Sequence, residues 1–421
     1  MRIAFVTDCF WPRVNGVTVS VQSFKDELER RGHEVIVLCP EYPKRDKSVP
    51  EPGVLRFDSM GNSFSVEDRL VHLHAFPSVF MALDRFRPDA VHINTEFALQ
   101  FAARLWCKAR GYPFLITAHT NWEHYIGNYM PRLPKPPLKV ISRTYMRLLH
   151  GTADILITPT SEMAAVLRSY HIRRKIRIIP SGIDPAMFVA DPAETASWRA
   201  RFENVHPALA GKRWLLFVGR VAEEKNVAFL IPSLARVVRK IPDAALVLVG
   251  DGPGRDHVER LAARAGLQDR VVVTGYLPRA ELRHVYANAE IFAFASKTET
   301  LGLATIEAMT AGVPVVAVGI MGTRTVMRGD NGGFMVREDL DEFSAACVRL
   351  LSDPALRAAK SAEAREWSKQ FSIAAQTDRM ERIFEFAASV RRSAMPVRRR
   401  IKVKLKWLYR AIEGYIRRLA E

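Results

Sequence analysis

The sequence has little cysteine and no long apolar run. The four cysteines are Cys9, Cys39, Cys107 and Cys347. They are far apart and lack the paired spacing of a zinc or redox site, so we expect reduced, packed thiols in a cytoplasmic protein. No stretch of about 18 or more apolar residues lacks charges and helix breakers, and even residues 301–322 contain Glu307 and Pro314. This argues against a membrane-spanning helix, and the first residues, MRIAFVTDCF, predict a strand rather than a signal peptide.

Negative charge is also scarce relative to positive charge. The net charge is +17 over 421 residues, which is typical of proteins that bind nucleic acid, an anionic membrane or a polyanionic substrate. Residues 391–421 hold eleven Lys and Arg against two Glu, so much of the excess lies at one end. An apolar fraction of 48% and a charged fraction of 25% are typical of a soluble globular protein. The length favours two domains of roughly 150–200 residues.

Short runs rich in Val, Ile and Leu alternate with helical patterns, as in parallel sheets with crossover helices. The first half contains RIAFVTD, EVIVLCP, DAVHINTE, PFLITAHT, ADILITPT and KIRIIPSG, with a helix expected over 17–31 and closed by Gly32. The second half restarts with RWLLFVGR, ALVLVGDG, RVVVTGY, EIFAFAS and VPVVAV. Between them, 184–212 is weakly periodic and predicts a linker. The sequence thus predicts an α/β protein of two Rossmann-like, doubly wound domains with an interdomain cleft.

Two cations follow the first strand of the second half. In doubly wound sheets ligands bind beyond the carboxyl ends of the strands, so the residues after each strand are candidates for a site. Arg220 and Lys225 follow WLLFVG on one loop and suit a diphosphate. The alternative is a solvated loop with an ion pair to Glu223 or Glu224.

Two glutamates eight positions apart follow the strand IFAFAS. Glu299 is expected in a loop, while Gly302 and Leu303 open a helix that Gly312 ends. A glutamate near a helix start complements the helix dipole, which accounts for Glu299 but not for Glu307 inside an apolar helix. A buried carboxylate needs a hydrogen-bond donor, which ribose hydroxyls would supply, and the free N–H groups at the helix start suit phosphate. The pair therefore predicts a nucleotide-sugar site.

The first half offers three further post-strand candidates. Gly16, in VNGV, lets backbone approach a ligand, although Asn-Gly is also a common turn. His119 ends LITAHT beside polar neighbours, although a lone histidine is more often structural. Glu96, after VHINT, has the same placement.

With these residues the chain resembles retaining nucleotide-sugar glycosyltransferases of the GT-B fold, in glycosyltransferase family four, over residues 1–390. The motifs are DCFWPRVNGV, HTNWEHY, VGR…EKN, LVGDGP and the glutamate pair before AMTAGVPVV. The resemblance implies an acceptor domain over 1–190, a donor-binding domain over 205–372 and a closing helix over 373–390 that returns to the first domain. In one departure, Thr300-Leu301-Gly302 stands where the family commonly has Gly-Phe-Gly or Ser-Phe-Gly.

The resemblance also implies a role for each candidate. The catalytic residues would be Glu299 at the donor sugar, His119 beside the transferred hexose, and Arg220 and Lys225 at the diphosphate. The donor-binding residues would be Gly16, Gly302, Leu303 and, at the ribose, Glu307. It further implies retention by front-face displacement, with no cofactor beyond the nucleotide sugar. We expect no metal site, because the Asp-Leu-Asp string at 339–341 begins an acidic surface helix.

The stretch HTNWEHYIGNYMPRLPKPPLKVISRTYMRLLH is similar to bacterial transferases that glycosylate diacylglycerol. Lys135, Lys139, Arg143 and Arg147 recur every four residues and would form a cationic stripe on a helix. An apolar surface is expected from Leu138, Ile141, Tyr145, Leu148 and Leu149. This pattern favours a helix on an anionic membrane surface, the alternative being a helix packed on the core.

Beyond the closing helix, 391–421 predicts a basic amphipathic tail on the membrane, with residues 396–421 as its anionic-lipid contact. An RNA-binding tail and a partner-docking helix are the alternatives, and no recognised nucleic-acid module is present.

These features together predict a peripheral enzyme at the cytoplasmic face of the cell membrane. It would transfer a hexose, from UDP-glucose first and GDP-mannose second, to a lipid such as diacylglycerol or a glycolipid. The alternatives are a soluble transferase with a sugar or polysaccharide acceptor, and a non-catalytic protein that binds nucleotide or polyanion.

Overall fold

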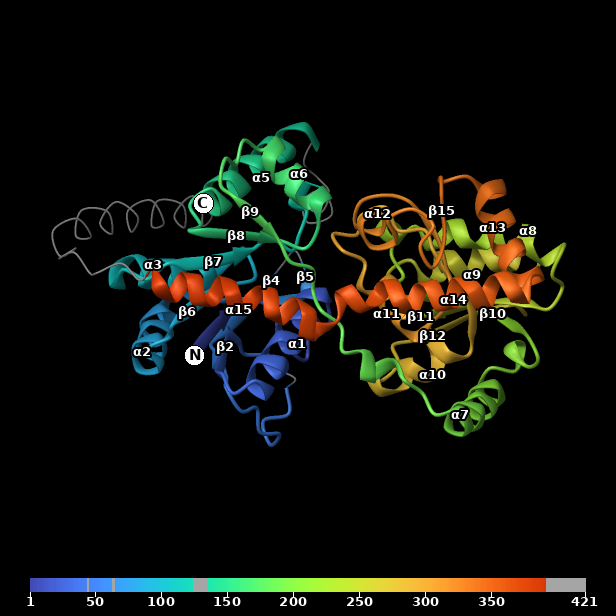
Figure 1. Cartoon of the computed structure of the whole chain (residues 1–421), viewed down its shortest axis with the longest axis horizontal. Helices are drawn as coiled ribbons and strands as arrows, with labels where there is room; N and C mark the ends of the chain where they lie inside the picture. Colours follow the sequence, from blue (N-terminus) through green and yellow to red (C-terminus); the bar gives the residue numbers. More distant parts are fainter. Residues whose placement is uncertain (44, 63–64, 124–134, 391–421) are drawn as a thin grey trace.

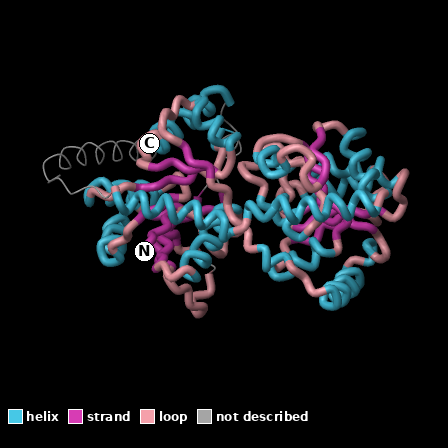
Figure 2. Tube along the Cα trace, in the orientation of Figure 1, coloured by secondary structure: helices cyan, strands magenta, loops and turns pink. Residues whose placement is uncertain are grey.

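The computed structural model describes residues 1–43, 45–62, 65–123 and 135–390. Two lobes, each built on a parallel sheet, lie side by side along the long axis of the molecule (Figure 1). Helices surround the strands of both lobes (Figure 2). The predicted basic tail over 391–421 lies outside the described residues.

The first lobe holds a parallel sheet that, over the described residues, has the strand order β3-β2-β1-β6-β7-β8-β9. Its strands are β1 (Arg2–Val6), β2 (Glu34–Pro40), β3 (Val54–Phe57), β6 (Ala90–Ile93), β7 (Phe114–Thr117), β8 (Ile155–Thr158) and β9 (Ile176–Ile178). Its helices are α1 (Gly16–Arg30), α2 (Phe76–Phe86), α3 (Ala98–Arg110), α5 (Lys135–His150) and α6 (Ser161–Ser169). A separate antiparallel hairpin, β4 (Ser59–Asn62) with β5 (Ser65–Val71), was not expected from the sequence.

The second lobe holds a parallel sheet with the strand order β12-β11-β10-β13-β14-β15. Its strands are β10 (Arg213–Val218), β11 (Ala244–Val249), β12 (Val271–Gly275), β13 (Ala289–Phe294), β14 (Val315–Val318) and β15 (Gly333–Val336). Its helices are α8 (Leu230–Val238), α9 (Arg255–Arg264), α10 (Leu282–Ala287), α11 (Leu303–Ala311), α12 (Gly322–Met327), α13 (Leu340–Ser352) and α14 (Pro354–Ser368).

The strands form where the sequence is continuously aliphatic, because both faces of a parallel sheet are covered by helices. Every residue of β11 and of β14 is buried, for example. The chain order reverses between β1 and β6 in the first lobe and between β10 and β13 in the second. Such reversal points open a crevice at the carboxyl ends of the strands, where ligands bind. The prediction of two Rossmann-like, doubly wound domains is confirmed.

The linker predicted over 184–212 is wrong in its central part, which forms α7 (Pro192–Val205). Asp191 caps this helix by accepting hydrogen bonds from two backbone N–H groups. Trp198 and Phe202 are buried in the core of the second lobe, with ring centroids 4.5 Å apart. These two aromatic side chains pack the helix onto the core. The segment has no regular apolar repeat, so its sequence pattern predicted a linker.

The chain crosses between the lobes twice, and the two crossings are bonded to one another. The backbone N–H of Ile183 donates to the carbonyl of Phe371 at 2.9 Å, and that of Ile373 donates to Ile183 at 2.8 Å. A Cβ atom on Gly182 would lie 2.5 Å from Ile373 Cα, so only glycine fits this approach. After the second crossing, α15 (Ile373–Ser389) packs on α1, and Figure 1 shows α14 and α15 in succession along both lobes.

Candidate active site

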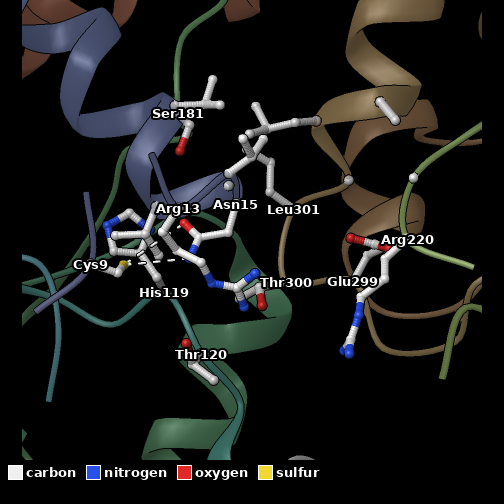
Figure 3. Close-up of a pocket in the computed structure, with 18 of the residues that line it drawn as sticks. Cys9, Arg13, Asn15, His119, Thr120, Ser181, Arg220, Glu299, Thr300 and Leu301 are labelled. Atoms are coloured by element: carbon white, nitrogen blue, oxygen red, sulfur yellow. Dashed lines mark hydrogen bonds between the residues drawn. The ribbon is translucent and has the colours of Figure 1, made fainter. Parts of the chain in front are cut away.

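A pocket of about 500 Å³ lies between the carboxyl ends of the two sheets. Its lining includes all eight residues predicted from the sequence to form the site, namely Gly16, His119, Arg220, Lys225, Glu299, Gly302, Leu303 and Glu307. Figure 3 shows Arg220 and Glu299 on the side of the second lobe and His119, with Arg13 and Asn15, on the side of the first. The structure therefore brings the candidates together around one space.

The two predicted cations take different partners. Lys225, on the loop after β10, forms an ion pair with Glu299 from the loop after β13. Arg220 Nη1 lies 3.5 Å from Glu224 Oε1, and its side chain is 46% exposed. The surface ion pair considered as an alternative therefore exists for Arg220, at a long distance from Glu224. The ammonium group of Lys225 instead pairs with Glu299, another predicted site residue.

The helix that carries Glu307 begins and ends as predicted. Gly302, with φ of 90°, precedes α11, and Gly312, with φ of 80°, follows it. Glu307 is buried, and the hydroxyl of Tyr286 donates to its Oε2 at 3.0 Å. Burial raises the pKa of Glu307, and the nearby positive charge of Arg279 opposes this shift. The carboxylate thus has a donor within the protein on one oxygen, a partner that the sequence pattern did not reveal.

The loop between Glu299 and Leu303 is also held from the first lobe. Thr160 Oγ1 donates to the carbonyl of Thr300 at 2.9 Å. The same hydroxyl caps α6 by accepting from the backbone N–H of Met163 at 3.2 Å. A second contact between the lobes joins Glu162 to the hydroxyl of Thr325. Thr300, where the sequence departs from the family pattern, therefore has its backbone fixed by the opposite lobe.

The starts of α1 and α11 face one another across the pocket. Gly16 is the first residue of α1, and a Cβ atom placed on it would lie 3.6 Å from Leu303 Cδ1. Asn15 caps α1 by accepting from the backbone N–H of Thr18 at 2.9 Å. Free N–H groups at helix starts bind anions, so both lobes present such groups to the same space.

His119 follows β7 and lies beside the amide of Asn94, whose Oδ1 is 3.3 Å from His119 Nε2. Burial lowers the pKa of His119 to about 4. The ring is therefore neutral at pH 7 and offers hydrogen bonds rather than charge.

Several pocket residues were missed by the sequence analysis. Tyr276 and Arg279 follow β12 and could have been found by applying the same post-strand rule to that strand. Asp68 and Arg69 reach the pocket from the β4–β5 hairpin, and Asp68 Oδ1 lies 3.2 Å from Arg13 Nε. Nothing in the sequence pattern indicates that this hairpin folds toward the cleft.

Over the described part of the chain, no group of three or more His, Cys, Asp or Glu side chains has an arrangement that could hold a metal ion. In the Asp-Leu-Asp string, Asp339 Oδ1 accepts from the backbone N–H groups of Asp341 and Glu342, each at 2.9 Å. This carboxylate caps α13.

The predicted cationic stripe on α5 is partly engaged within the protein. Arg143 and Lys139 reach Glu123 at 2.8 and 3.7 Å. Arg147 is exposed, and the side chain of Lys135 lies outside the described residues.

The predicted apolar surface of α5 is wrong in part, because three of its members face inward. Leu138 and Leu149 are buried in the first lobe, and Tyr145 packs partly buried against the core of the same lobe. Val140, Ile141 and Leu148 instead form an exposed apolar face, with exposed fractions of 63%, 58% and 65%. Among the helices that the structure describes, none has the length and apolar character needed to cross a membrane.

Two family matches cover most of the chain. Residues 14–187 match Glycosyltransferase Family 4, and residues 199–367 match Glycosyl transferases group 1.

Two curated relatives are similar to this chain in sequence, and one solved structure is similar to it in fold. The chain is 29% identical over 326 residues to the alpha-monoglucosyldiacylglycerol synthase of Streptococcus pneumoniae, covering 76% of this chain and 71% of that protein. It is 29% identical over 379 residues to a GDP-mannose-dependent alpha-mannosyltransferase of Mycolicibacterium smegmatis, covering 87% and 94%. Its fold matches that of sucrose-phosphate synthase from Thermosynechococcus elongatus with a TM-score of 0.74 and 22% identity, covering 92% of this chain and 99% of that one. The chain belongs to the GT-B glycosyltransferases that join a family 4 domain to a group 1 domain.

Proposed function

We propose that this glycosyltransferase transfers a hexose from a nucleotide sugar to a membrane lipid such as diacylglycerol or a glycolipid. UDP-glucose is the first donor candidate and GDP-mannose the second. The observation that carries the proposal is the pocket itself, where Arg220 and Lys225 lie with Glu299 and Glu307 on one wall. By its name, the Streptococcus pneumoniae relative makes alpha-monoglucosyldiacylglycerol, which supports a glucose donor and a lipid acceptor. The Mycolicibacterium smegmatis relative is named as GDP-mannose-dependent, which supports the second donor candidate.

In the proposed reaction the anomeric configuration is retained. The bond from the sugar C1 to the diphosphate breaks, and a bond from C1 to the acceptor oxygen forms on the same face. The proton of the acceptor hydroxyl passes to the departing diphosphate. Arg220, Lys225 and the helix starts at Gly16 and Leu303 would neutralise the diphosphate charge without a metal ion. Glu299 would hold the sugar hydroxyls and Glu307 the ribose, while neutral His119 would hydrogen-bond the transferred hexose.

The proposed site of action is the inner face of the cell membrane. The exposed apolar face of α5 (Val140, Ile141 and Leu148) lies beside Arg143 and Arg147 on the same helix. An amphipathic helix of this kind lies in the interface with its apolar side chains among the lipids and its cations at anionic headgroups.

The test uses labelled UDP-glucose or GDP-mannose with liposomes of phosphatidylglycerol and diacylglycerol. We expect labelled lipid, and we expect the Ile141→Glu, Leu148→Glu double variant to lose both sedimentation and lipid product while binding donor normally. Met81→Glu is the control, because Met81 is equally exposed but lies on α2. No labelled lipid with either donor would contradict the proposal.

A soluble sugar or polysaccharide acceptor is the second candidate. The charged wall of Arg13, Asp68 and Arg69 favours it, because such side chains hydrogen-bond polyols. Deleting 396–421 should abolish liposome sedimentation only if the lipid proposal is right. A non-catalytic protein would bind UDP without consuming any donor.

A further inference from the structure

Three acidic side chains of the first lobe, Asp8, Asp68 and Glu96, line the pocket. Asp68 pairs with Arg13, and the other two differ in their partners. Asp8 is saturated by donors, because Thr95 Oγ1 and the backbone N–H groups of Phe97 and Leu99 all donate to it, at 2.7, 3.1 and 2.8 Å. It therefore fixes the start of α3. Glu96 is only 2% exposed, yet among the described residues no donor forms a hydrogen bond with its Oε1. Buried carboxylate oxygens are normally paired, and the nearest cationic or ring nitrogen that the structure describes is His150 Nε2 at 3.5 Å, so the pairing of Glu96 within the protein is incomplete.

Glu96 lies at the carboxyl ends of the strands of the first sheet, where the transfer reaction is expected. It follows β6, whose Ile93 pairs with Ile116 of β7, so the loop of Glu96 and the loop of His119 leave neighbouring strands. Asn94, two residues before Glu96, bridges these loops through its contact with His119. Glu96 itself lines the pocket, on the side opposite the glutamates of the second lobe.

Helix α5 holds Glu96 at two points. The hydroxyl of Tyr145 donates to the backbone carbonyl of Glu96. His150 Nε2 lies 3.5 Å from Glu96 Oε1, and His150 is fully buried. The helix whose outer face carries the exposed apolar residues thus contacts a pocket carboxylate with its inner face.

We propose that Glu96 accepts a hydrogen bond from the hydroxyl group of the acceptor that attacks the donor sugar. Tyr145 and His150 are positioning residues, because they hold Glu96 without reaching the pocket themselves. The ligand class is an alcohol, either the free hydroxyl of a lipid or a hydroxyl of a sugar headgroup. This inference rests on the proposed transferase function but not on the lipid nature of the acceptor.

The competing explanation is that Glu96 and His150 only form a buried ion pair that anchors α5. This explanation predicts that loss of Glu96 lowers stability and affects both substrates alike. A ligand role predicts a defect toward the acceptor alone, since a hydrogen bond to a charged oxygen contributes to acceptor binding and not to donor binding.

The test measures three quantities for the wild type and Glu96→Gln: initial rates against acceptor concentration, the Kd of UDP, and slow donor hydrolysis without acceptor. The acceptor is whichever of dioctanoylglycerol, octyl glucoside or glycerol the wild type glycosylates best. We expect kcat/KM for the acceptor to fall about tenfold or more, with the Kd of UDP and the hydrolysis rate unchanged. Tyr145→Phe should show a smaller loss of the same selective kind.

Glu123→Gln is the matched control, because Glu123 also binds α5, through Arg143, but does not line the pocket. Its kcat/KM for the acceptor should stay at the wild-type value. An equal loss in Glu123→Gln, an unchanged kcat/KM for the acceptor in Glu96→Gln, or a parallel loss of UDP binding would overturn the inference. Transfer to glycerol but to neither dioctanoylglycerol nor octyl glucoside would end the lipid proposal alone, and transfer to none of the three would end both.

Discussion

Lys225 and Glu299 form an ion pair in the wall of the pocket, although 74 residues separate them in the chain. Both side chains are largely buried, so each limits the rotamers of the other before any donor arrives. The ammonium group carries three donors and can contact a diphosphate oxygen while it keeps the carboxylate. The pair therefore couples the loop expected to bind phosphate to the loop expected to bind sugar.

Replacing Lys225 with alanine should weaken donor binding about tenfold to a hundredfold, since one charge-assisted hydrogen bond is lost. Isothermal titration with UDP and with UDP-glucose measures this change. Lys369→Ala is the control, because Lys369 forms an exposed ion pair with Glu366 far from the pocket lining. Equal affinity in Lys225→Ala and the wild type would remove Lys225 from the diphosphate site.

Tyr286→Phe should leave Glu307 Oε2 without its buried donor. We expect a loss of about 1–3 kcal/mol in the free energy of unfolding at neutral pH and weaker donor binding, because an unpaired buried carboxylate is destabilising. Urea unfolding and UDP titration measure the two effects. The same substitution made in a Glu307→Gln background should cost much less, and full additivity of the two changes would show that the contact is not coupled.

His92 should make the protein sensitive to acid. Burial lowers its pKa from the ordinary value of 6.5 to about 3, so below pH 6.5 the unfolded chain binds a proton that the native state does not. The free energy of unfolding should therefore fall as the pH falls, by about 3 kcal/mol at pH 4.5 from this residue. The measurement is urea unfolding of the wild type and His92→Gln between pH 7 and 4.5. The free energy of unfolding should fall less in the variant than in the wild type over this range.

Asp8 opposes this trend, because burial raises its pKa to about 6 and it binds a proton in the native state first. It is present in both proteins, so its contribution cancels in the difference between them. Parallel pH profiles for the wild type and His92→Gln would contradict the assignment.

Thr160→Ala should remove both the cap of α6 and the bond to the carbonyl of Thr300. Loss of a helix cap costs about 1 kcal/mol, which thermal unfolding would detect. We also expect a higher KM for the donor sugar, since the loop after Glu299 loses its contact with the first lobe. Thr160→Ser keeps the hydroxyl and should restore both quantities. A KM that is unchanged in Thr160→Ala would show that the loop does not need this contact.

The strands of the two sheets could be predicted because buried parallel strands are continuous aliphatic runs, as in ALVLVG and VPVVAV. Strands β3 and β15 were not predicted, because both are only partly buried and lack this signal. Helix α7 was missed because Trp198 and Phe202 supply its packing in place of a periodic apolar stripe. The β4–β5 hairpin is polar, and only tertiary contacts show where it lies.

The candidate site could be predicted as a set of residues but not as a set of contacts. The positions after strands are fixed by topology, and this rule found Arg220, Glu299 and His119. The partners Tyr286 and Thr160 are on helices or loops far away in sequence, and no local pattern connects them with the residues that they hold. Asp8 and Glu96 both follow strands of the first lobe, and only the fold decides which carboxylate finds donors.

The mutual bonding of the chain crossings at Ile183 and Phe371–Ile373 has a mechanical consequence. Two connecting segments that are hydrogen-bonded to one another act as a single short hinge. Such a hinge opposes sliding of the lobes past each other and their separation along the long axis. Rotation of one lobe relative to the other about that hinge is the motion that remains. Substrate entry and product exit would then depend on one angular coordinate, which two spectroscopic labels, one on each lobe, are enough to follow.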